Sequence, residues 1–209
     1  MSRPEPRSHH DGVTGTGFRR HLKQATDAHH QRVDQRFDQL DLHSNADRRI
    51  FLHSHALALS NVAPFLDRAH EVSGPVSFLP RVWSEQVRLL EADLRQDLAV
   101  SGDNPAVFDL PLDASHHVLG ITYVIAGSRL GGQVLAKRFA AKQSGARVPH
   151  YLTRPLPQGA WRQLCDHLDS IVDGEIQDQV VCSAMYMFDR FEGAVTRTKQ
   201  DERGNIYRQ

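Results

Sequence analysis

The stretch YVIAGSRLGGQVL, from Tyr123 to Leu135, is apolar and holds three glycines within six positions, Gly127, Gly131 and Gly132. A glycine inside a helix costs up to about 1 kcal/mol relative to alanine, so this cluster needs a structural reason. Three reasons are open: a kink, a close approach of the backbone to a flat ligand, or a tight crossing of two helices. The surrounding apolar segment, Ala114 to Ala146, is long enough to predict a helix.

Helical periodicity continues outward from this stretch in both directions. In the first segment, Phe18, Leu22, Val33 and Phe37 follow one another along an apolar stripe at helical steps. Ser44 or Asn45 can cap the next helix, and Pro64 is expected to kink or break it. No segment shows the period of two that is typical of a strand. The predicted helices cover residues 18–40, 45–62, 76–100, 114–146, 161–172 and 175–198, and the fold class is therefore all-α.

Length and the composition of the ends predict a single domain. The chain has 209 residues, which suits one domain with short tails. Residues 1–16 are rich in proline, glycine, serine and charge and are expected to form a flexible arm. The folded helical domain is expected over residues 17–199, with a flexible tail at 200–209.

Composition excludes several classes of function. The 25 basic and 25 acidic residues balance to a net charge of zero, whereas a nucleic-acid binder normally has a basic excess. No apolar run approaches the ~20 residues of a membrane span, and the first residues lack the apolar core of a secretory signal. Two cysteines, Cys165 and Cys182, cannot build a disulfide framework, and we expect both to be core or near-core thiols in a cytoplasmic protein. The 13 histidines are the remaining unusual feature.

Two adjacent histidines on the first helix are candidates for a ligand site. On a helical wheel His29 lies in the middle of the apolar stripe, and His30 lies about 100° further round. His30 shares its flank with Lys23, seven residues earlier. A histidine in such a place is usually a satisfied boundary residue, but it can also be an axial ligand, with Lys23 reaching a carboxylate of the same ligand.

The two features together resemble one family. LKQATDAHHQRVD, from Leu22 to Asp34, is similar to the proximal helix of the biliverdin-forming heme oxygenases, and the stretch from Tyr123 to Leu135 is similar to their kinked distal helix. The order and separation of the two segments also match, and the resemblance runs from about Phe18 to Glu192. It leans toward the bacterial branch associated with phytochrome photoreceptors, and it implies a single-domain helical bundle.

The resemblance also implies the roles of individual residues. The spacing from Thr26 places the iron-ligating histidine at His30, with His29 as the alternative because the wheel favours it. Gly127 and Gly131 correspond to distal glycines whose missing side chains let the backbone lie against the porphyrin. The histidine then holds iron on one face and leaves the other face for dioxygen.

Three further residues are expected at the edge of the heme. Lys23 corresponds to a basic residue that meets a heme propionate, and Arg162 falls near a second such position. Tyr123 is expected to contribute a hydroxyl at the same edge. For Lys23 and Arg162, an ordinary solvated charge is the alternative.

One departure from the family affects the distal side. Many relatives carry an aspartate after the first distal glycine, where this chain has Ser128, and bacterial relatives carry a glutamate where it has Ala126. A serine hydroxyl can join a chain of water molecules but carries no charge, so proton delivery is in question. Arg129 follows directly and could supply a charge.

The implied function is oxidative cleavage of heme b to biliverdin, carbon monoxide and ferrous iron, with catalysis assigned to the distal Gly127, Ser128 and Gly131. The chain has no dinucleotide fingerprint, so electrons must come from an external ferredoxin or flavoprotein reductase. A bacteriophytochrome is a candidate receiver of the biliverdin. Two alternatives are a non-catalytic heme carrier or sensor on the same fold, and a helical signalling module in which an exposed histidine accepts phosphate.

The other histidines do not predict a second metal site. His53 and His55 are two residues apart, so on a helix they point to different faces, and His116 and His117 are adjacent. Two helical ligands to one metal need a spacing of three or four. We therefore expect His30 to be the metal ligand and the others, including His167, to have no such role.

Overall fold

The computed structural model describes residues 17–60, 62–66, 83–98, 117–141 and 147–206. Within these residues every regular element is a helix, which confirms the all-α prediction, and they form a single domain. The labelled helices are α1 (Phe18–Phe37), α2 (Asn45–Leu59), α4 (Trp83–Leu98), α5 (Val118–Ala141), α6 (His150–Thr153), α7 (Ala160–Asp169) and α8 (Gly174–Ile206). The predicted arm and residues 76–82 and 99–100 of the third predicted helix lie outside the described residues.

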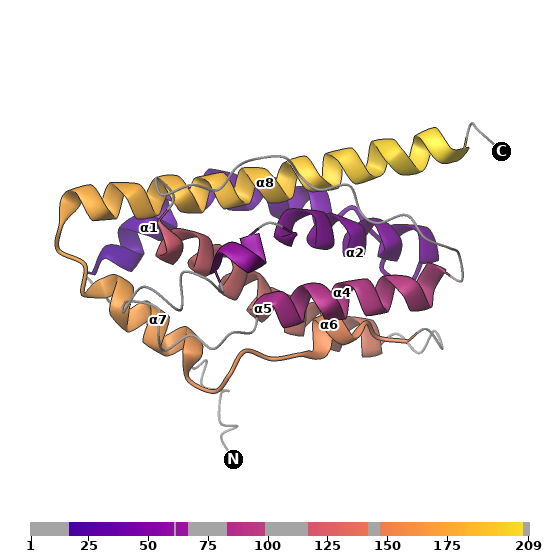
Figure 1. Cartoon of the computed structure of the whole chain (residues 1–209), viewed down its shortest axis with the longest axis horizontal. Coiled ribbons are helices and arrows are strands. Elements are labelled where there is room, and N and C mark those ends of the chain that lie inside the picture. Colours follow the sequence, from indigo (N-terminus) through magenta and orange to yellow (C-terminus); the bar gives the residue numbers. More distant parts are fainter. Residues whose placement is uncertain (1–16, 61, 67–82, 99–116, 142–146, 207–209) are drawn as a thin grey trace, which may run out of the picture.

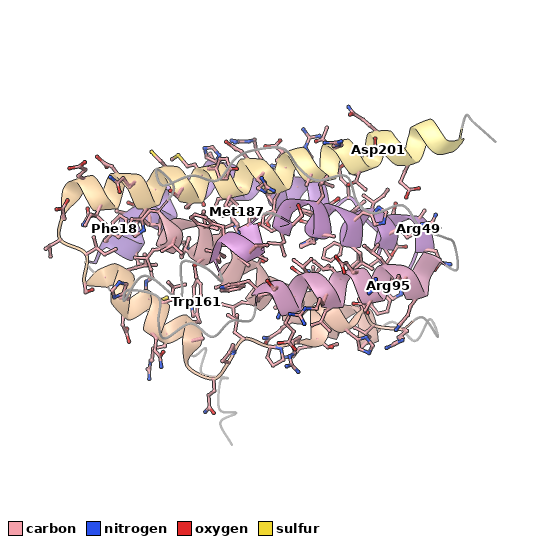
Figure 2. The ribbon with its side chains drawn as sticks, viewed as in Figure 1. Phe18, Arg49, Arg95, Trp161, Met187 and Asp201 are labelled. Carbon is pink, nitrogen blue, oxygen red and sulfur yellow. The ribbon has the colours of Figure 1, made fainter. Side chains whose placement is uncertain are left out.

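Helix α8 organises the bundle. It runs along the whole length of the molecule and packs against α1, α2 and α5 (Figure 1). Its apolar face carries Val180, Ala184, Met187 and Phe191, spaced three or four residues apart and all buried. The side chains that fill the core between the helices are drawn in Figure 2.

The helix ends follow from local chemistry. Ser44 caps α2 through its hydroxyl, which accepts a hydrogen bond from the Asp47 amide at 3.4 Å, as predicted. Asp173 accepts hydrogen bonds from the Glu175 and Ile176 amides and so caps α8. Gly159 precedes α7 with φ of +79°, a left-handed conformation that favours glycine.

Several predicted boundaries need correction. Helix α2 ends at Leu59, before Pro64, which lies inside a separate short helix at 62–66. Proline is tolerated there because the amides of a first helical turn have no intrahelical acceptor. Helix α8 continues to Ile206, eight residues beyond the predicted end at Thr198, and so covers part of the segment expected to be a flexible tail.

The segment between the helices predicted at 114–146 and 161–172 contains a short helix, α6, that was not predicted. Helix α6 is held at one end by the buried carboxylate of Asp93, which accepts hydrogen bonds from the His150 and Tyr151 amides at 3.0 and 2.7 Å. At the other end the buried guanidinium of Arg129 donates to the carbonyls of Tyr151 and Arg154. Two buried charges from α4 and α5 therefore fix a four-residue helix through its backbone.

The two cysteines differ in their burial. Cys165 is buried, as expected, whereas Cys182 is exposed on α8, so its prediction as a core thiol was wrong.

Helix α5 is long and apolar enough to cross a membrane, and half of its most apolar window is buried within the protein. That burial is typical of the core helix of a bundle.

Candidate functional site

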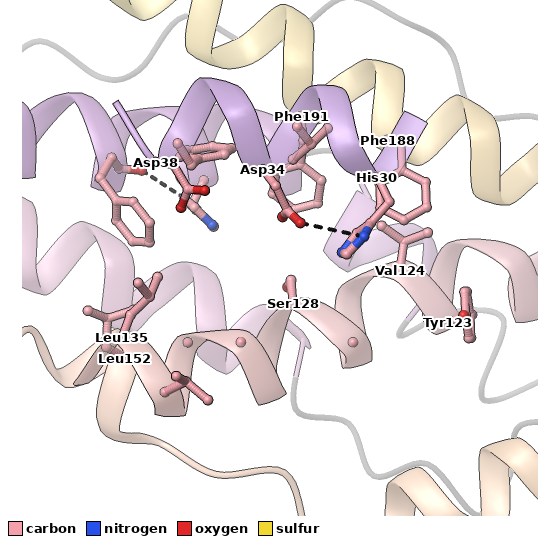
Figure 3. Close-up of a pocket in the computed structure, with 18 of the residues that line it drawn as sticks. His30, Asp34, Asp38, Tyr123, Val124, Ser128, Leu135, Leu152, Phe188 and Phe191 are labelled. Atoms are coloured by element: carbon pink, nitrogen blue, oxygen red, sulfur yellow. Dashed lines mark hydrogen bonds and ion pairs between the residues drawn. The ribbon is translucent and has the colours of Figure 1, made fainter. Parts of the chain in front are cut away.

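A cavity of about 460 Å³ lies between α1 and α5. Figure 3 shows His30 and Asp34 on α1, and Asp38 directly after it, facing Tyr123, Val124, Ser128 and Leu135 on α5 across this space. The side chains of α2, α6 and α8 close the cavity behind them. An apolar cleft with a few convergent polar groups is the usual form of a small-molecule site.

The wall formed by α1 is polar because one face of the helix carries ionisable residues at steps of three and four. Lys23, Asp27, His30, Asp34 and Asp38 all line the cavity. Five ionisable side chains on one wall give a ligand several points of charge contact.

The structure distinguishes the two adjacent histidines. His30 lines the cavity, and its ring packs edge-on against Phe188 with a centroid separation of 5.5 Å. His29 is turned to the outer face of the α1–α8 pair, where its Nδ1 lies 2.7 Å from a carboxylate oxygen of Asp189. The wheel placed His29 in the buried stripe, and its side chain is indeed the less exposed of the two, at 21% against 56% for His30, but it contacts α8 and does not line the cavity.

Asp34 lies beside the ring of His30. The Nδ1 of His30 lies 3.5 Å from a carboxylate oxygen of Asp34, one helical turn further on. Because Nδ1 faces Asp34, Nε2 is left for the cavity. Partial burial raises the pKa of Asp34, and the charge of Asp38 adds to this rise, whereas His30 opposes it.

The wall formed by α5 is bare where it faces His30. A Cβ atom added to Gly131 would meet nothing within 4 Å, and one added to Gly127 would meet only the ring of Trp161, at 3.9 Å. Gly132 differs, because its added Cβ would lie 3.5 Å from Leu152. Gly127 and Gly131 thus leave the helix backbone open to the cavity, and helix crossing does not explain them.

The close helix crossing occurs elsewhere on α5. A Cβ on Gly120 would lie 2.2 Å from the backbone oxygen of Val180 on α8. The explanation by helix crossing therefore applies to a glycine outside the cluster.

The polar groups next to the glycines are only partly available. Ser128 lines the cavity, but its hydroxyl donates to the carbonyl of Ile125 at 2.8 Å, so its oxygen remains as an acceptor. Ala126 is buried in the core. Arg129 points away from the cavity and binds α6, so the charge that the sequence suggested for the distal side is used elsewhere.

Two of the three residues expected at the edge of the heme line the cavity. Lys23 and Tyr123 both line it, and the Tyr123 ring stacks on Trp161 with centroids 5.7 Å apart. Burial raises the pKa of Tyr123, so its hydroxyl stays protonated at neutral pH. Arg162 is exposed and is not among the lining residues, because Trp161 takes the inward position of α7.

No family model and no curated protein matches the chain. A solved structure does: the NO- and CO-bound heme oxygenase from Neisseria meningitidis, with a TM-score of 0.66, 23% sequence identity and coverage of 88% of this chain and 92% of that one. The chain has the heme oxygenase fold. At this identity the likeness concerns the fold alone, so the function of this cavity has to be argued from its residues.

Sequence reasoning missed several residues of the cavity in this heme oxygenase fold. Asp34 and Asp38 follow His30 by four and eight residues, and that same-face spacing could have found them. Trp161, which adjoins the predicted Arg162, lines the cavity and was not predicted. His55 was dismissed because of its spacing from His53, yet it lines the cavity from α2.

Proposed function

We propose that the chain is a heme oxygenase that binds heme b between α1 and α5 and cleaves it oxidatively to biliverdin, carbon monoxide and ferrous iron. The observation that carries this proposal is the pairing of His30 with a bare glycine wall across one cavity. A flat macrocycle needs an iron ligand on one face and a close, side-chain-free backbone on the other. The heme oxygenase fold supports the same assignment.

The residues of the cavity fit this ligand. His30 offers Nε2 to the iron. Asp34 holds the ring by its other nitrogen, as a neighbouring carboxylate often does for a histidine that binds a metal. Phe188 and Val124 supply apolar contacts, and the space beside Gly131 admits a ring edge that any larger residue would block. When bound, the heme supplies the dioxygen chemistry, which the protein orients.

The propionates are assigned to the edge where Lys23 and Tyr123 lie. A lysine ammonium and a protonated phenol both donate hydrogen bonds to carboxylates. Arg162 does not join them in this arrangement, because it is exposed and outside the lining.

On the distal side, Ser128 directly follows Gly127 and lines the cavity. Its hydroxyl donates a hydrogen bond to the carbonyl oxygen of Ile125, so Ser128 accepts a hydrogen bond from a water molecule rather than donating one. Gly127 and Gly131 admit the ligand, and Ser128 holds the water beside it. The proton must then come through that water.

The remaining parts of the proposal concern partners. Electrons come from an external ferredoxin or flavoprotein reductase, and the protein acts in the cytoplasm. The biliverdin is passed to a bacteriophytochrome, as in the phytochrome-associated branch of the family. Neither a nucleic acid nor a membrane is a partner in this scheme.

Turnover tests the enzymatic part directly. Hemin-loaded protein is supplied with dioxygen and either ascorbate or reduced ferredoxin, and its absorption spectrum is followed. We expect the hemin absorption to bleach and the absorption of biliverdin to appear, with carbon monoxide released. Bound hemin that persists through these conditions would contradict the enzymatic function.

A non-catalytic heme carrier or sensor is the second candidate. It is favoured by Ser128 and Ala126, which leave the distal side without a carboxylate at either position. In that case His30 still binds iron and the spectrum of bound hemin outlasts the reductant. Introducing the missing carboxylate as Ser128→Asp should then create or accelerate bleaching.

A further inference from the structure

Arg129 carries a charge that its bonds to α6 do not require. The residue is only 1% exposed, and its Nη2 donates hydrogen bonds to the carbonyl oxygens of Tyr151 and Arg154. Two carbonyls need only two N–H groups, which a neutral side-chain amide also provides. The positive charge of Arg129 therefore needs a further explanation.

The guanidinium of Arg129 is incompletely compensated. Its Nε and Nη1 are buried and have no hydrogen-bond partner, and among the described residues it forms no ion pair. The ring of Tyr151, with its centroid 4.1 Å from Cζ, offers only the weak negative charge of an aromatic face. A buried cation without a counter-ion is unfavourable, so most of this charge is available to act on its surroundings.

The charge lies directly behind the wall of the cavity. Tyr151 and Gly132 both line the cavity, and a Cβ added to Gly132 would lie 3.9 Å from Nη1 of Arg129. His55 lines the cavity from α2, and the charge of Arg129 contributes, after burial, to lowering its pKa. Arg129 is not itself a lining residue, so its charge acts on the cavity through one layer of residues.

The charged residues that line the cavity do not cancel this effect. They are all exposed, so water and salt screen them: Lys23, Asp27, Asp34, Asp38 and Arg138. The buried carboxylate of Asp93 lies at the other end of α6, where it accepts hydrogen bonds from two amides and lies 3.2 Å from Nδ1 of His150. The buried charge of Arg129 therefore gives the neighbouring part of the cavity a positive potential.

We propose that the buried charge of Arg129 favours the reduced form of an iron macrocycle bound in the cavity. In this reduction one electron passes from the external reductant to ferric iron, and no bond forms or breaks. A fixed positive charge repels ferric iron more than ferrous iron, and burial preserves this difference because water does not screen it. The inference rests on the proposed function, in which the macrocycle is heme.

The reduction potential of bound heme tests the inference. Hemin-loaded protein is equilibrated without dioxygen against a redox dye of known potential, and absorption gives the ratio of ferrous to ferric heme. In Arg129→Gln, whose neutral amide still offers donors to the backbone, we expect this ratio at a fixed potential to fall at least threefold. Arg129→Lys keeps the charge and should stay within twofold of the wild type. An unchanged ratio in Arg129→Gln, or an equal fall in Arg129→Lys, would overturn the inference.

A matched control separates the buried charge from an exposed one. Lys137 lies eight residues further along α5, is exposed and does not line the cavity, so Lys137→Gln should leave the ratio unchanged. Raising the salt concentration from about 0.05 to about 0.5 M should also preserve the difference between Arg129→Gln and the wild type, because salt screens buried charges weakly. An equal fall in Lys137→Gln, or a difference that disappears in salt, would overturn the role of burial.

The ligand-free protein tests whether the charge reaches the cavity at all. NMR signals of the histidine rings are followed against pH, and His55 should gain its proton at a higher pH in Arg129→Gln than in the wild type. An unchanged titration would overturn the inference without any reference to heme. Thermal unfolding confirms that each variant is folded, and Arg129→Met replaces Arg129→Gln if the latter is not. Wild-type protein that binds no hemin would contradict the proposed function, whereas an unchanged ratio in hemin-loaded Arg129→Gln contradicts this inference alone.

Discussion

Helix α5 uses glycine in two opposite ways along its length. Near its beginning, Gly120 is pressed against α8, and an added Cβ would lie 2.2 Å from the backbone oxygen of Val180. Eleven residues later, an added Cβ on Gly131 would meet nothing within 4 Å. The first glycine serves the packing of the fold and the second serves the cavity, although both are glycines on one apolar helix.

The largest expected effect is at the packed glycine. Gly120→Ala forces a methyl group into the backbone of α8, which cannot move aside cheaply, and should lower the free energy of unfolding by about 3 kcal/mol. Gly131→Ala is the matched control. It should raise the free energy of unfolding by about 0.5–1 kcal/mol, because alanine is the better helix former and its methyl group meets no atom. Equal losses in the two variants in urea denaturation would remove the distinction.

The second prediction tests whether water reaches the ring of His55 in the cavity. The pKa of His55 is lowered to about 4 in the folded chain, from 6.5 when unfolded, so the unfolded state binds the proton more readily. Its contribution to stability is complete above pH 6.5 and is lost as the pH falls toward 4, by about 3 kcal/mol. Unfolding measured against pH should show this loss in the wild type and a smaller one in His55→Gln. Parallel curves would mean that water hydrates the ring.

The third prediction concerns the one charged residue within the glycine cluster. Arg129 points away from the cavity, lies 4.1 Å over the ring of Tyr151 and donates to two backbone carbonyls. Arg129→Met keeps much of the volume but leaves those carbonyls without a donor, so the free energy of unfolding should fall by about 2 kcal/mol. The affinity of the folded variant for hemin should change little. A selective loss of affinity would place Arg129 on the cavity side.

The smallest effect on stability and the clearest effect on binding are expected at the open glycine. Gly131→Leu projects an apolar side chain into the cavity and should change the free energy of unfolding by no more than about 1 kcal/mol. It should weaken hemin binding at least tenfold, because the side chain occupies the space of the ligand. Unchanged affinity in a hemin titration would show that the cavity beside Gly131 is not the binding site.

The two glycines also show what could and what could not be predicted from the sequence. Periodicity was sufficient to predict an all-α chain, since a stripe such as Phe18, Leu22 and Phe37 depends only on local geometry. It could not separate Gly120 from Gly131, because the difference lies in what α8 places beside each. Likewise the wheel favoured His29 over His30: a wheel shows the face of a single helix, and Asp189 comes from another.

Other residues of the cavity needed the tertiary structure as well. His55 was dismissed on its spacing from His53, yet it meets the cavity through the packing of α2 against α8. Arg162 was expected at the cavity edge, but the turn of α7 brings Trp161 there instead. Asp34 is the exception, because its spacing of four from His30 was present in the sequence.

The central claim is that His30, and not His29, binds iron opposite the glycine wall, and a hemin titration of three proteins tests it most directly. Wild type and His29→Ala should bind hemin with the same affinity and the same absorption spectrum, since His29 is engaged with Asp189 at the surface. His30→Ala should bind at least tenfold more weakly and with an altered spectrum. A spectrum and affinity unchanged in His30→Ala, or lost in His29→Ala alone, would contradict the account.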